Sequence, residues 1–179
     1  MRVLGAVLAG GRSSRFGSDK AAALIDGRTM LDRVIDIVGP QVDDLLVCGR
    51  QLAGRTCVAD HPASDLGPLG GVNAALRYAA ANGFDAVLSV PCDTPGLPAD
   101  LREQLGEPGE GVVVAGLPVI GLWPARLHEV LDSFLAQGGS RAIGAWAAHA
   151  GARRVALREL PANVNRPEDL DRLTGGDAG

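Results

Sequence analysis

The sequence predicts an α/β protein with three layers, in which a mostly parallel sheet is covered by helices on both faces. Two observations predict this class. Short apolar runs typical of strands alternate along the chain with stretches whose apolar residues recur at helical spacing. The run over residues 86–90 is nearly all apolar, which is typical of a central strand that helices cover on both sides.

The expected elements follow in order from these local patterns. Strands are expected over residues 3–9, 45–48, 56–59, 86–91, 111–115, 119–123 and 153–157. Helices are expected over residues 30–38, 71–81, 124–136 and 140–150, with a last short helix that starts at Pro167. In the first helix Thr29 is the expected N-cap, Asp32 stands at the third position, and Gly39-Pro40 is the expected stop.

Length and composition restrict the classes of function. A chain of 179 residues fits one domain, expected over 1–174, with a flexible glycine-rich tail over 175–179. A net charge of −4 and only 3% aromatic residues argue against a nucleic-acid partner. No apolar run approaches the roughly 20 residues of a membrane span. The three cysteines lack CxxC spacing and no secretory signal is apparent, so we expect a cytoplasmic protein without a membrane partner.

Residues 3–20 are the most informative segment, because an apolar strand runs there into a loop rich in glycine and positive charge. The loop reads Gly10-Gly11-Arg12-Ser13-Ser14-Arg15-Phe16-Gly17-Ser18-Asp19-Lys20. Glycines let backbone N–H groups approach a ligand closely, and Arg15 and Lys20 add positive charge, so the loop predicts a phosphate-binding site for a nucleotide. The spacing fits neither a Walker loop nor the dinucleotide fingerprint. A polar surface loop is the alternative.

A second signal follows the strand expected at residues 86–91. The chain there reads Pro91-Cys92-Asp93-Thr94-Pro95, which places one carboxylate at the carboxyl end of the most buried strand. A single aspartate suits phosphate-bound Mg²⁺, because this ion keeps several waters and takes few protein ligands. An aspartate that only turns the chain before Pro95 is the alternative.

The glycine loop resembles the signature L-A-G-G-x-S-x-R-[MF]-G-x-D-K of the MobA family, the molybdenum cofactor guanylyltransferases. Three later segments are similar to further family motifs: the segment around Asp93, Asp65-Leu66-Gly67-Pro68-Leu69-Gly70-Gly71, and Asn163-Val164-Asn165-Arg166-Pro167-Glu168-Asp169-Leu170. The resemblance implies a Rossmann-like nucleotidyltransferase fold and the transfer of GMP from GTP to molybdopterin, with release of pyrophosphate. It also implies Mg²⁺ as cofactor, and a molybdenum insertase and the chaperones of target molybdoenzymes as partners.

The resemblance implies roles for individual residues as well. The catalytic group would be Arg15, Lys20 and Asp93. The nucleotide would contact Leu8, Ala9, Gly10, Gly11, Lys20, Cys48, Asp60 and Asp93, with Asp65 as the competitor of Asp60 for the nucleoside. The metal would lie on Asp93 and Asn165, and Asn163 would face the acceptor.

Two departures from the family pattern bear on the substrates. Cys48 stands where many members carry an asparagine that contacts the nucleotide. The segment over 111–121 is uncharged where members usually have a basic residue, and Arg141 is the candidate to supply that charge, with a solvated side chain as the alternative. Two other functions remain open: a related nucleotidyltransferase that uses CTP or another acceptor, and a non-catalytic nucleotide-binding adaptor. Gly10 favours guanine, because the cytidylyltransferase pattern reads L-A-A-G.

Overall fold

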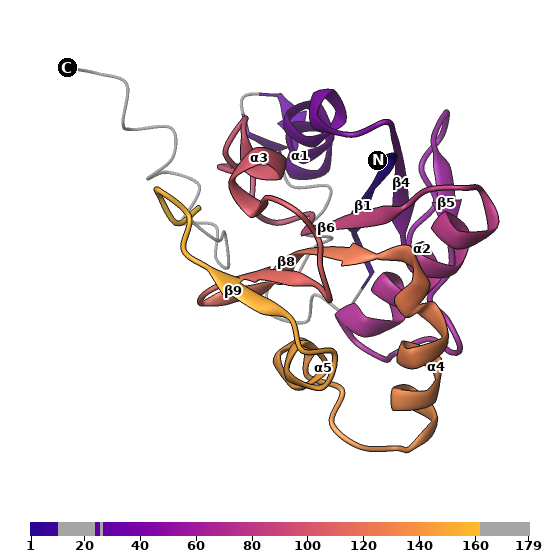
Figure 1. The fold of residues 1–179 in the computed structure, drawn as a ribbon. Helices are drawn as coiled ribbons and strands as arrows, with labels where there is room; N and C mark the ends of the chain where they lie inside the picture. The colour runs from indigo at the N-terminus through magenta and orange to yellow at the C-terminus, as the bar shows by residue number, and fades with distance from the viewer. Residues whose placement is uncertain (11–23, 26, 162–179) are drawn as a thin grey trace.

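The computed structural model describes residues 1–10, 24–25 and 27–161, and within them seven strands form one sheet (Figure 1). The strand order is β5-β4-β1-β6-β8-β7-β9. The strands are β1 (Val3–Leu8), β4 (Asp44–Cys48), β5 (Thr56–Val58), β6 (Ala86–Pro91), β7 (Val112–Val114), β8 (Leu117–Pro124) and β9 (Arg153–Val155). Only β8 runs against its neighbours in this sheet, so the prediction of a mostly parallel sheet is confirmed.

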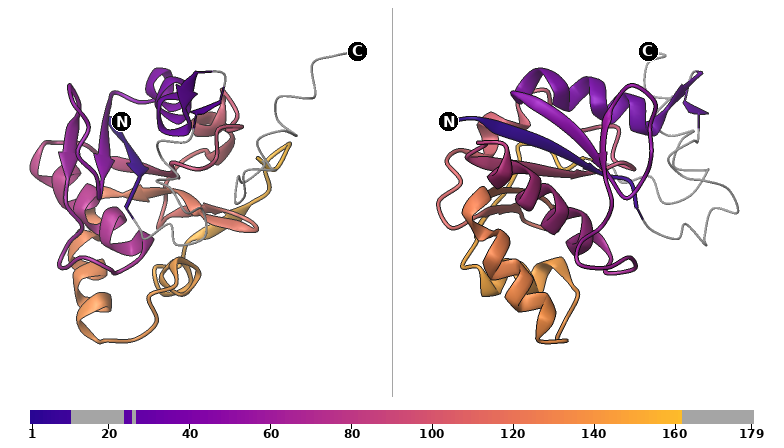
Figure 2. Two further views of the ribbon diagram at one scale, coloured as in Figure 1. Left: turned by 180° about the vertical axis from the view of Figure 1, so that it is seen from behind. Right: turned by 90° about the vertical axis from the view of Figure 1, so that its right-hand side faces the viewer.

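Helices cover both faces of this sheet, which confirms the three-layer architecture (Figures 1 and 2). One face carries α1 (Met30–Val38) and α3 (Leu101–Leu105), and the other carries α2 (Pro68–Ala81), α4 (His128–Ala136) and α5 (Ile143–His149). The alternation of β1 explains why both layers are needed. Val3 and Val7 pack in the cluster with α1 and α3, whereas Leu4, Ala6 and Leu8 pack in the cluster with α2, α4 and α5.

The first helix begins as its sequence predicts. The Thr29 hydroxyl oxygen accepts a hydrogen bond of 3.0 Å from the backbone N–H of Asp32, and the same hydroxyl donates to the Asp32 carboxylate at 2.6 Å. This satisfies one of the N–H groups that a helix start leaves without an intrahelical partner. The expected stop is less abrupt than predicted, because a 3₁₀ turn, Gly39–Gln41, continues from the end of α1.

Several predicted boundaries need correction. Helix α2 starts at Pro68 rather than at residue 71, since proline is well tolerated in a first helical turn. The helix expected over 124–136 divides into the end of β8, a 3₁₀ turn Ala125–Leu127, and α4. The helix expected over 140–150 is shorter at both ends. Helix α3 and a small hairpin of β2 (Leu24–Ile25) and β3 (Arg28–Thr29) were not predicted from the sequence.

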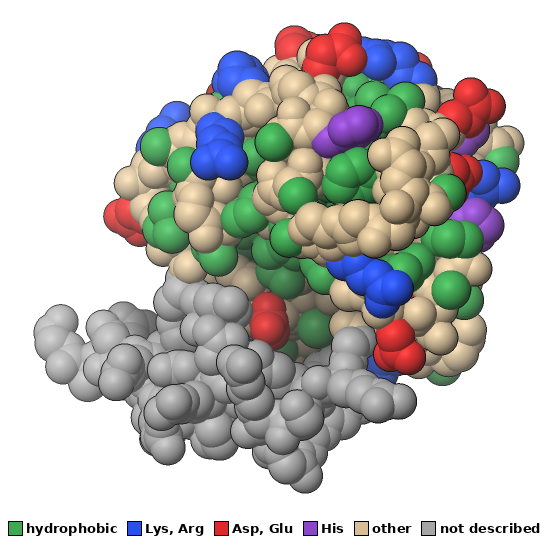
Figure 3. Space-filling view, turned by 90° about the horizontal axis from the view of Figure 1, so that it is seen from below, with side chains coloured by type: hydrophobic (Ala, Val, Ile, Leu, Met, Phe, Trp, Pro, Cys, Tyr) green, Lys and Arg blue, Asp and Glu red, His purple; other side chains and the backbone are tan. Residues whose placement is uncertain are grey.

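The surface formed by α2, α4 and α5 has its charges mixed. Figure 3 shows basic and acidic side chains scattered over this face, without a broad basic patch among the described residues. Among the residues that the structure describes, no helix is both long enough and apolar enough to cross a bilayer. The last helix expected from Pro167 and the expected tail lie outside the described residues.

Candidate functional site

The carboxyl ends of three parallel strands bring the predicted loops to one edge of the sheet. Leu8, the last residue of β1, pairs with Cys48 on β4 and with Pro91 on β6. Past these pairs the ladder continues for one step: the N–H of Ala9 donates to the Cys48 carbonyl at 3.0 Å, and the N–H of Cys92 donates to the Leu8 carbonyl at 3.1 Å. The start of the glycine loop is therefore held between the segment after β4 and the segment that carries Asp93.

A pocket lies at this edge of the sheet. Its lining is Leu8, Gly10, Cys48, Asp60, Gly67, Pro68 and Gly71. The sequence predicts contact with a nucleotide for the first four of these residues. The last three belong to the glycine-rich motif at the start of α2. The structure therefore brings together residues from four separate segments, although their role in binding stays a prediction. Ala9 lies beside the pocket in the β1 extension.

Glycines make this close convergence possible. A Cβ added to Gly71 would lie 2.9 Å from the Leu8 side chain and 3.1 Å from the Cβ of Cys48, so a larger residue would displace the pocket wall. A Cβ added to Gly70 would likewise lie 2.9 Å from the Cβ of Asp60. Both glycines sit in the first turn of α2, where the helix packs closely against the loop that carries Asp60.

Asp60 supplies a carboxylate to the lining of the pocket. It follows β5, its side chain is half-buried, and a Cβ on Gly10 would lie 3.6 Å from each of its carboxylate oxygens. Burial, and to a lesser extent the negative charge of Asp65, raises the pKa of Asp60 above its usual value. Asp65 is exposed, has φ of +64°, and does not belong to the pocket lining. The geometry therefore favours Asp60 over Asp65 for contact with a bound ligand.

Cys48 contributes a neutral wall. Its side chain is buried, and burial first, then the nearby charge of Asp60, raises the pKa of its thiol far above the usual range. A protonated thiol is a weak hydrogen-bond partner, so the polar groups that this segment offers are those of the backbone.

Asp93 stands in the half-buried turn directly after β6. Its carboxylate is an oxygen donor, and Mg²⁺ is usually bound by one or two carboxylates together with substrate phosphates. Asp93 lies at the edge where the glycine loop begins, so the chemistry of the donor fits this ion. Asn165, the second predicted ligand, lies outside the described residues, as do Gly11, Arg15, Lys20 and Asn163.

Two further observations extend the predicted site. Arg141 lies in the segment before α5, and its guanidinium donates to the backbone carbonyl of Asp65 at 3.3 Å, so it touches the loop that leads into the pocket. Gly49, which was not predicted from the sequence as a site residue, has φ of +76° and packs against Gly10. The sequence did contain a signal for Gly49, because this glycine directly follows the strand that ends at Cys48, at the edge of the sheet where the pocket lies.

The chain is similar to known proteins over nearly its whole length. The family model described as "MobA-like NTP transferase domain" matches residues 5–155. A protein of Cereibacter sphaeroides named "Molybdenum cofactor guanylyltransferase" is 40% identical over 185 residues, covering 96% of this chain and 95% of that protein. A protein of the same name from Sinorhizobium fredii is also 40% identical, covering 92% of this chain and 87% of its own length.

Solved structures show the same fold. The structure of molybdopterin-guanine dinucleotide biosynthesis protein A from Archaeoglobus fulgidus superposes with a TM-score of 0.77 at 20% identity. The superposition covers 94% of this chain and 95% of that one. The match to the family model and the relatives at 40% identity show that this chain belongs to the MobA-like NTP transferase family.

Proposed function

We propose that this chain transfers GMP from GTP to molybdopterin, which yields molybdopterin guanine dinucleotide and pyrophosphate. The observation that carries the proposal is the pocket in which Leu8, Gly10, Cys48 and Asp60 converge, beside the strand end that carries Asp93. Relatives at 40% identity over nearly the whole chain are named molybdenum cofactor guanylyltransferase, which supports guanine as the base and molybdopterin as the acceptor.

The nucleoside of GTP would lie against the residues that line this small pocket, with the carboxylate of Asp60 as its polar contact. The triphosphate would then extend along the glycine loop that begins at Gly10, where backbone N–H groups would bind phosphate oxygens. Arg15 and Lys20, later in this loop, would neutralise the triphosphate and the charge that develops on the departing pyrophosphate.

Asp93 and Asn165 are the residues proposed to hold Mg²⁺. When bound there, the ion would neutralise negative charge on the phosphate oxygens of the nucleotide. Asp93 is well placed for this role because it follows β6, which pairs directly with β1, and the glycine loop begins after β1.

In the reaction, a phosphate oxygen of molybdopterin attacks the α-phosphorus of GTP in line with the leaving group. A new P–O bond forms to the acceptor while the bond from the α-phosphorus to the bridging oxygen breaks, and pyrophosphate departs with that electron pair. The acceptor phosphate is already ionised at neutral pH, so the step requires no general base. The protein contributes by positioning the two substrates and by neutralising charge.

The decisive experiment measures pyrophosphate release from GTP, molybdopterin and Mg²⁺ by the parent chain and by Asp93→Asn. We expect the substitution to lower the rate at least about 100-fold, because the lost carboxylate is the proposed ligand of the Mg²⁺ that would neutralise charge on the phosphate oxygens. Asp44→Asn is the matched control: it changes an exposed aspartate where β4 begins, at the opposite edge of the sheet. Near-full activity of Asp93→Asn would contradict the assigned role, and GTP binding by the parent without any pyrophosphate release would favour an adaptor.

A second candidate is a related nucleotidyltransferase that uses CTP or another acceptor. It is favoured by the buried, neutral Cys48 in the pocket wall and by the uncharged side chains of β7 and the start of β8. Direct binding of GTP, CTP and UTP in the presence of Mg²⁺ separates the two, and we expect GTP to bind most tightly. The insertase, the chaperone partners and the cytoplasmic location stay predictions of the family resemblance.

A further inference from the structure

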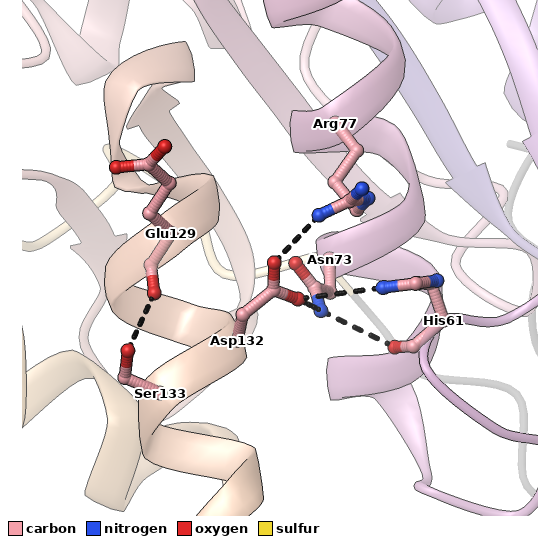
Figure 4. Close-up of polar contacts among 6 residues, drawn as sticks. All are labelled: His61, Asn73, Arg77, Glu129, Asp132 and Ser133. Atoms are coloured by element: carbon pink, nitrogen blue, oxygen red, sulfur yellow. Dashed lines mark hydrogen bonds and ion pairs between the residues drawn. The ribbon is translucent and has the colours of Figure 1, made fainter.

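The loop that carries Asp60 is anchored through the next residue, His61. The backbone N–H of His61 donates to the carbonyl of Gly70 at 3.1 Å, and its own carbonyl accepts from the side-chain amide of Asn73 at 3.4 Å. Its imidazole Nε2 lies 3.5 Å from a carboxylate oxygen of Asp132 (Figure 4). These three contacts hold His61, the residue after Asp60. They therefore restrict the direction in which the side chain of Asp60 points.

Asn73 links this loop to the interior of α2. Its side chain is completely buried, and its amide nitrogen donates both to the His61 carbonyl and to a carboxylate oxygen of Asp132 at 2.6 Å. Both partners can only accept hydrogen bonds, so the NH₂ group and not the carbonyl oxygen of Asn73 must face them. The orientation of Asn73 therefore depends on the carboxylate, and the contact with His61 depends on that orientation.

Asp132 supplies this carboxylate from α4. Its second oxygen accepts a hydrogen bond of 2.6 Å from the guanidinium of Arg77 on α2, which completes a cluster of four polar side chains between α2, α4 and the loop (Figure 4). Asp132 does not belong to the lining of the pocket. No local spacing in the sequence joins it to His61, since their contact depends on how α4 packs against α2.

We propose that Asp132 is a positioning residue for Asp60, an inference that rests on the proposed role of Asp60 at the nucleoside. Asp132 orients the buried amide of Asn73 and contacts the imidazole of His61, and both contacts hold the residue that follows Asp60. The carboxylate of Asp60 is thereby fixed toward the pocket before the ligand enters. Preorganisation of this kind lowers the conformational cost of binding.

The remaining contacts predict that the fold survives without Asp132. The loop keeps the backbone bond from His61 to Gly70 and the bond from Arg141 to Asp65. The apolar contacts of α4, such as Leu131 in the core, do not involve the carboxylate. Loss of Asp132 should therefore weaken the placement of Asp60 and leave the rest of the pocket in place.

The test compares Asp132→Ala with the parent chain for two ligands, GTP and inorganic tripolyphosphate, by calorimetry in Mg²⁺. We expect the Kd for GTP to rise about tenfold, equivalent to the loss of one good polar contact, and the Kd for tripolyphosphate to stay within about twofold. The matched control is Glu129→Ala, one turn earlier on α4, whose exposed carboxylate is not part of the cluster (Figure 4). This variant should bind both ligands as the parent does.

The Asp60→Ala background decides whether Asp132 acts through Asp60. We expect Asp132→Ala to add less than about a twofold loss of GTP affinity there, because coupled residues are not additive. A further tenfold loss, or an equal loss for both ligands in the single variant, would overturn the inference. If the alanine variant does not fold, Asp132→Asn replaces it, with an expected increase of about threefold because one acceptor oxygen remains.

The two hypotheses fail in different ways. A parent chain that does not bind GTP contradicts the proposed function itself. A parent chain that binds GTP, together with an Asp132→Ala variant of unchanged affinity, contradicts only the positioning role.

Discussion

Gly49 packs directly against Gly10, so closely that a Cβ added to Gly49 would lie 2.6 Å from the Cα of Gly10 and 2.9 Å from its nitrogen. Gly49 also has φ of +76°, which L-residues with a side chain rarely adopt. The two glycines come from the ends of adjacent parallel strands, β4 and β1. Their contact therefore determines where the glycine loop, which begins at Gly10, leaves the sheet.

The first prediction is that Gly49→Ala impairs the loop. The positive φ alone costs about 1–3 kcal/mol for a residue with a Cβ, and the overlap with Gly10 should force the loop to move. We expect a free energy of unfolding lowered by more than that strain, and a Kd for GTP raised at least about tenfold. Urea unfolding and calorimetry measure the two effects.

The matched control is Gly54→Ala. Gly54 has nearly the same φ, +74°, but no atom lies within 4 Å of the position of an added Cβ. This variant should show the strain of the backbone without the displacement of Gly10, and it should bind GTP normally. Equal effects of the two substitutions on GTP affinity would contradict the role given to the Gly49–Gly10 contact.

The second prediction concerns the core. Ser89 is completely buried on β6, where its hydroxyl accepts from the indole N–H of Trp123 at 3.0 Å and donates to the carbonyl of Val119 at 3.0 Å. Ser89→Ala would leave the buried indole N–H without a partner, at a cost of about 1–3 kcal/mol in the free energy of unfolding. Urea unfolding measures this, with the exposed Ser133→Ala on α4 as control, expected within about 0.5 kcal/mol of the parent. A Ser89 variant as stable as the parent would show that the indole finds another partner.

Much of the fold follows from local sequence, for physical reasons that can be named. β6 is apolar at almost every position because both of its faces are covered, and Thr29 caps α1 because its hydroxyl sits three residues before an N–H that needs an acceptor. The reversed direction of β8 also has a local cause: only Ala115 and Gly116 join β8 to β7, with Gly116 at φ +83°, and so short a turn makes two paired strands antiparallel. The apolar pattern of a strand does not encode its direction, so that pattern alone did not predict the reversal.

Part of the candidate site was also predictable from the sequence, and part of it was not. Gly10, Cys48 and Asp60 each follow or end a predicted strand, and parallel strands place such ends at one edge, so their convergence was predictable once the family motif was identified. The contact of His61 with Asp132 was not predictable. It joins a loop to a helix far along the chain, and only the packing of α4 on α2 brings the two together.

The third prediction tests the role expected for Arg141. Its guanidinium is exposed and touches the loop at Asp65 with one N–H group, so the remaining donors are available to an anionic ligand beside the pocket. We expect Arg141→Ala to raise the KM for molybdopterin about tenfold and to change the KM for GTP less than about twofold. Steady-state pyrophosphate release measures both constants.

The control for Arg141 is Arg126→Ala, another exposed arginine, which forms an ion pair with Glu110. It should leave both constants unchanged. An effect of Arg141→Ala confined to GTP would assign this side chain to the support of the nucleotide loop instead of the acceptor.

The last prediction follows from the raised pKa of Asp60. The folded chain binds the proton of this carboxyl more tightly than the unfolded chain, so stability falls as pH rises from the ordinary aspartate range, near about 3.9, through the raised folded value. At pH 7 the ionised, half-buried carboxylate therefore costs folding free energy. We expect Asp60→Asn to be more stable than the parent at pH 7, and the difference to disappear as the pH falls below the ordinary aspartate value. Urea unfolding between pH 3 and 8 tests this.

The same substitution should weaken GTP binding at pH 7, because the carboxylate that destabilises the fold is the proposed contact with the nucleoside. Asp65→Asn is the control, since asparagine tolerates the φ of +64° at this position. Removing the Asp65 charge lowers the pKa of Asp60, so this variant should be slightly stabilised at pH 7 and keep its GTP affinity. If Asp65→Asn, and not Asp60→Asn, lost GTP binding, the nucleoside contact would belong to Asp65, and the pKa of Asp60 would reflect burial without a role in binding.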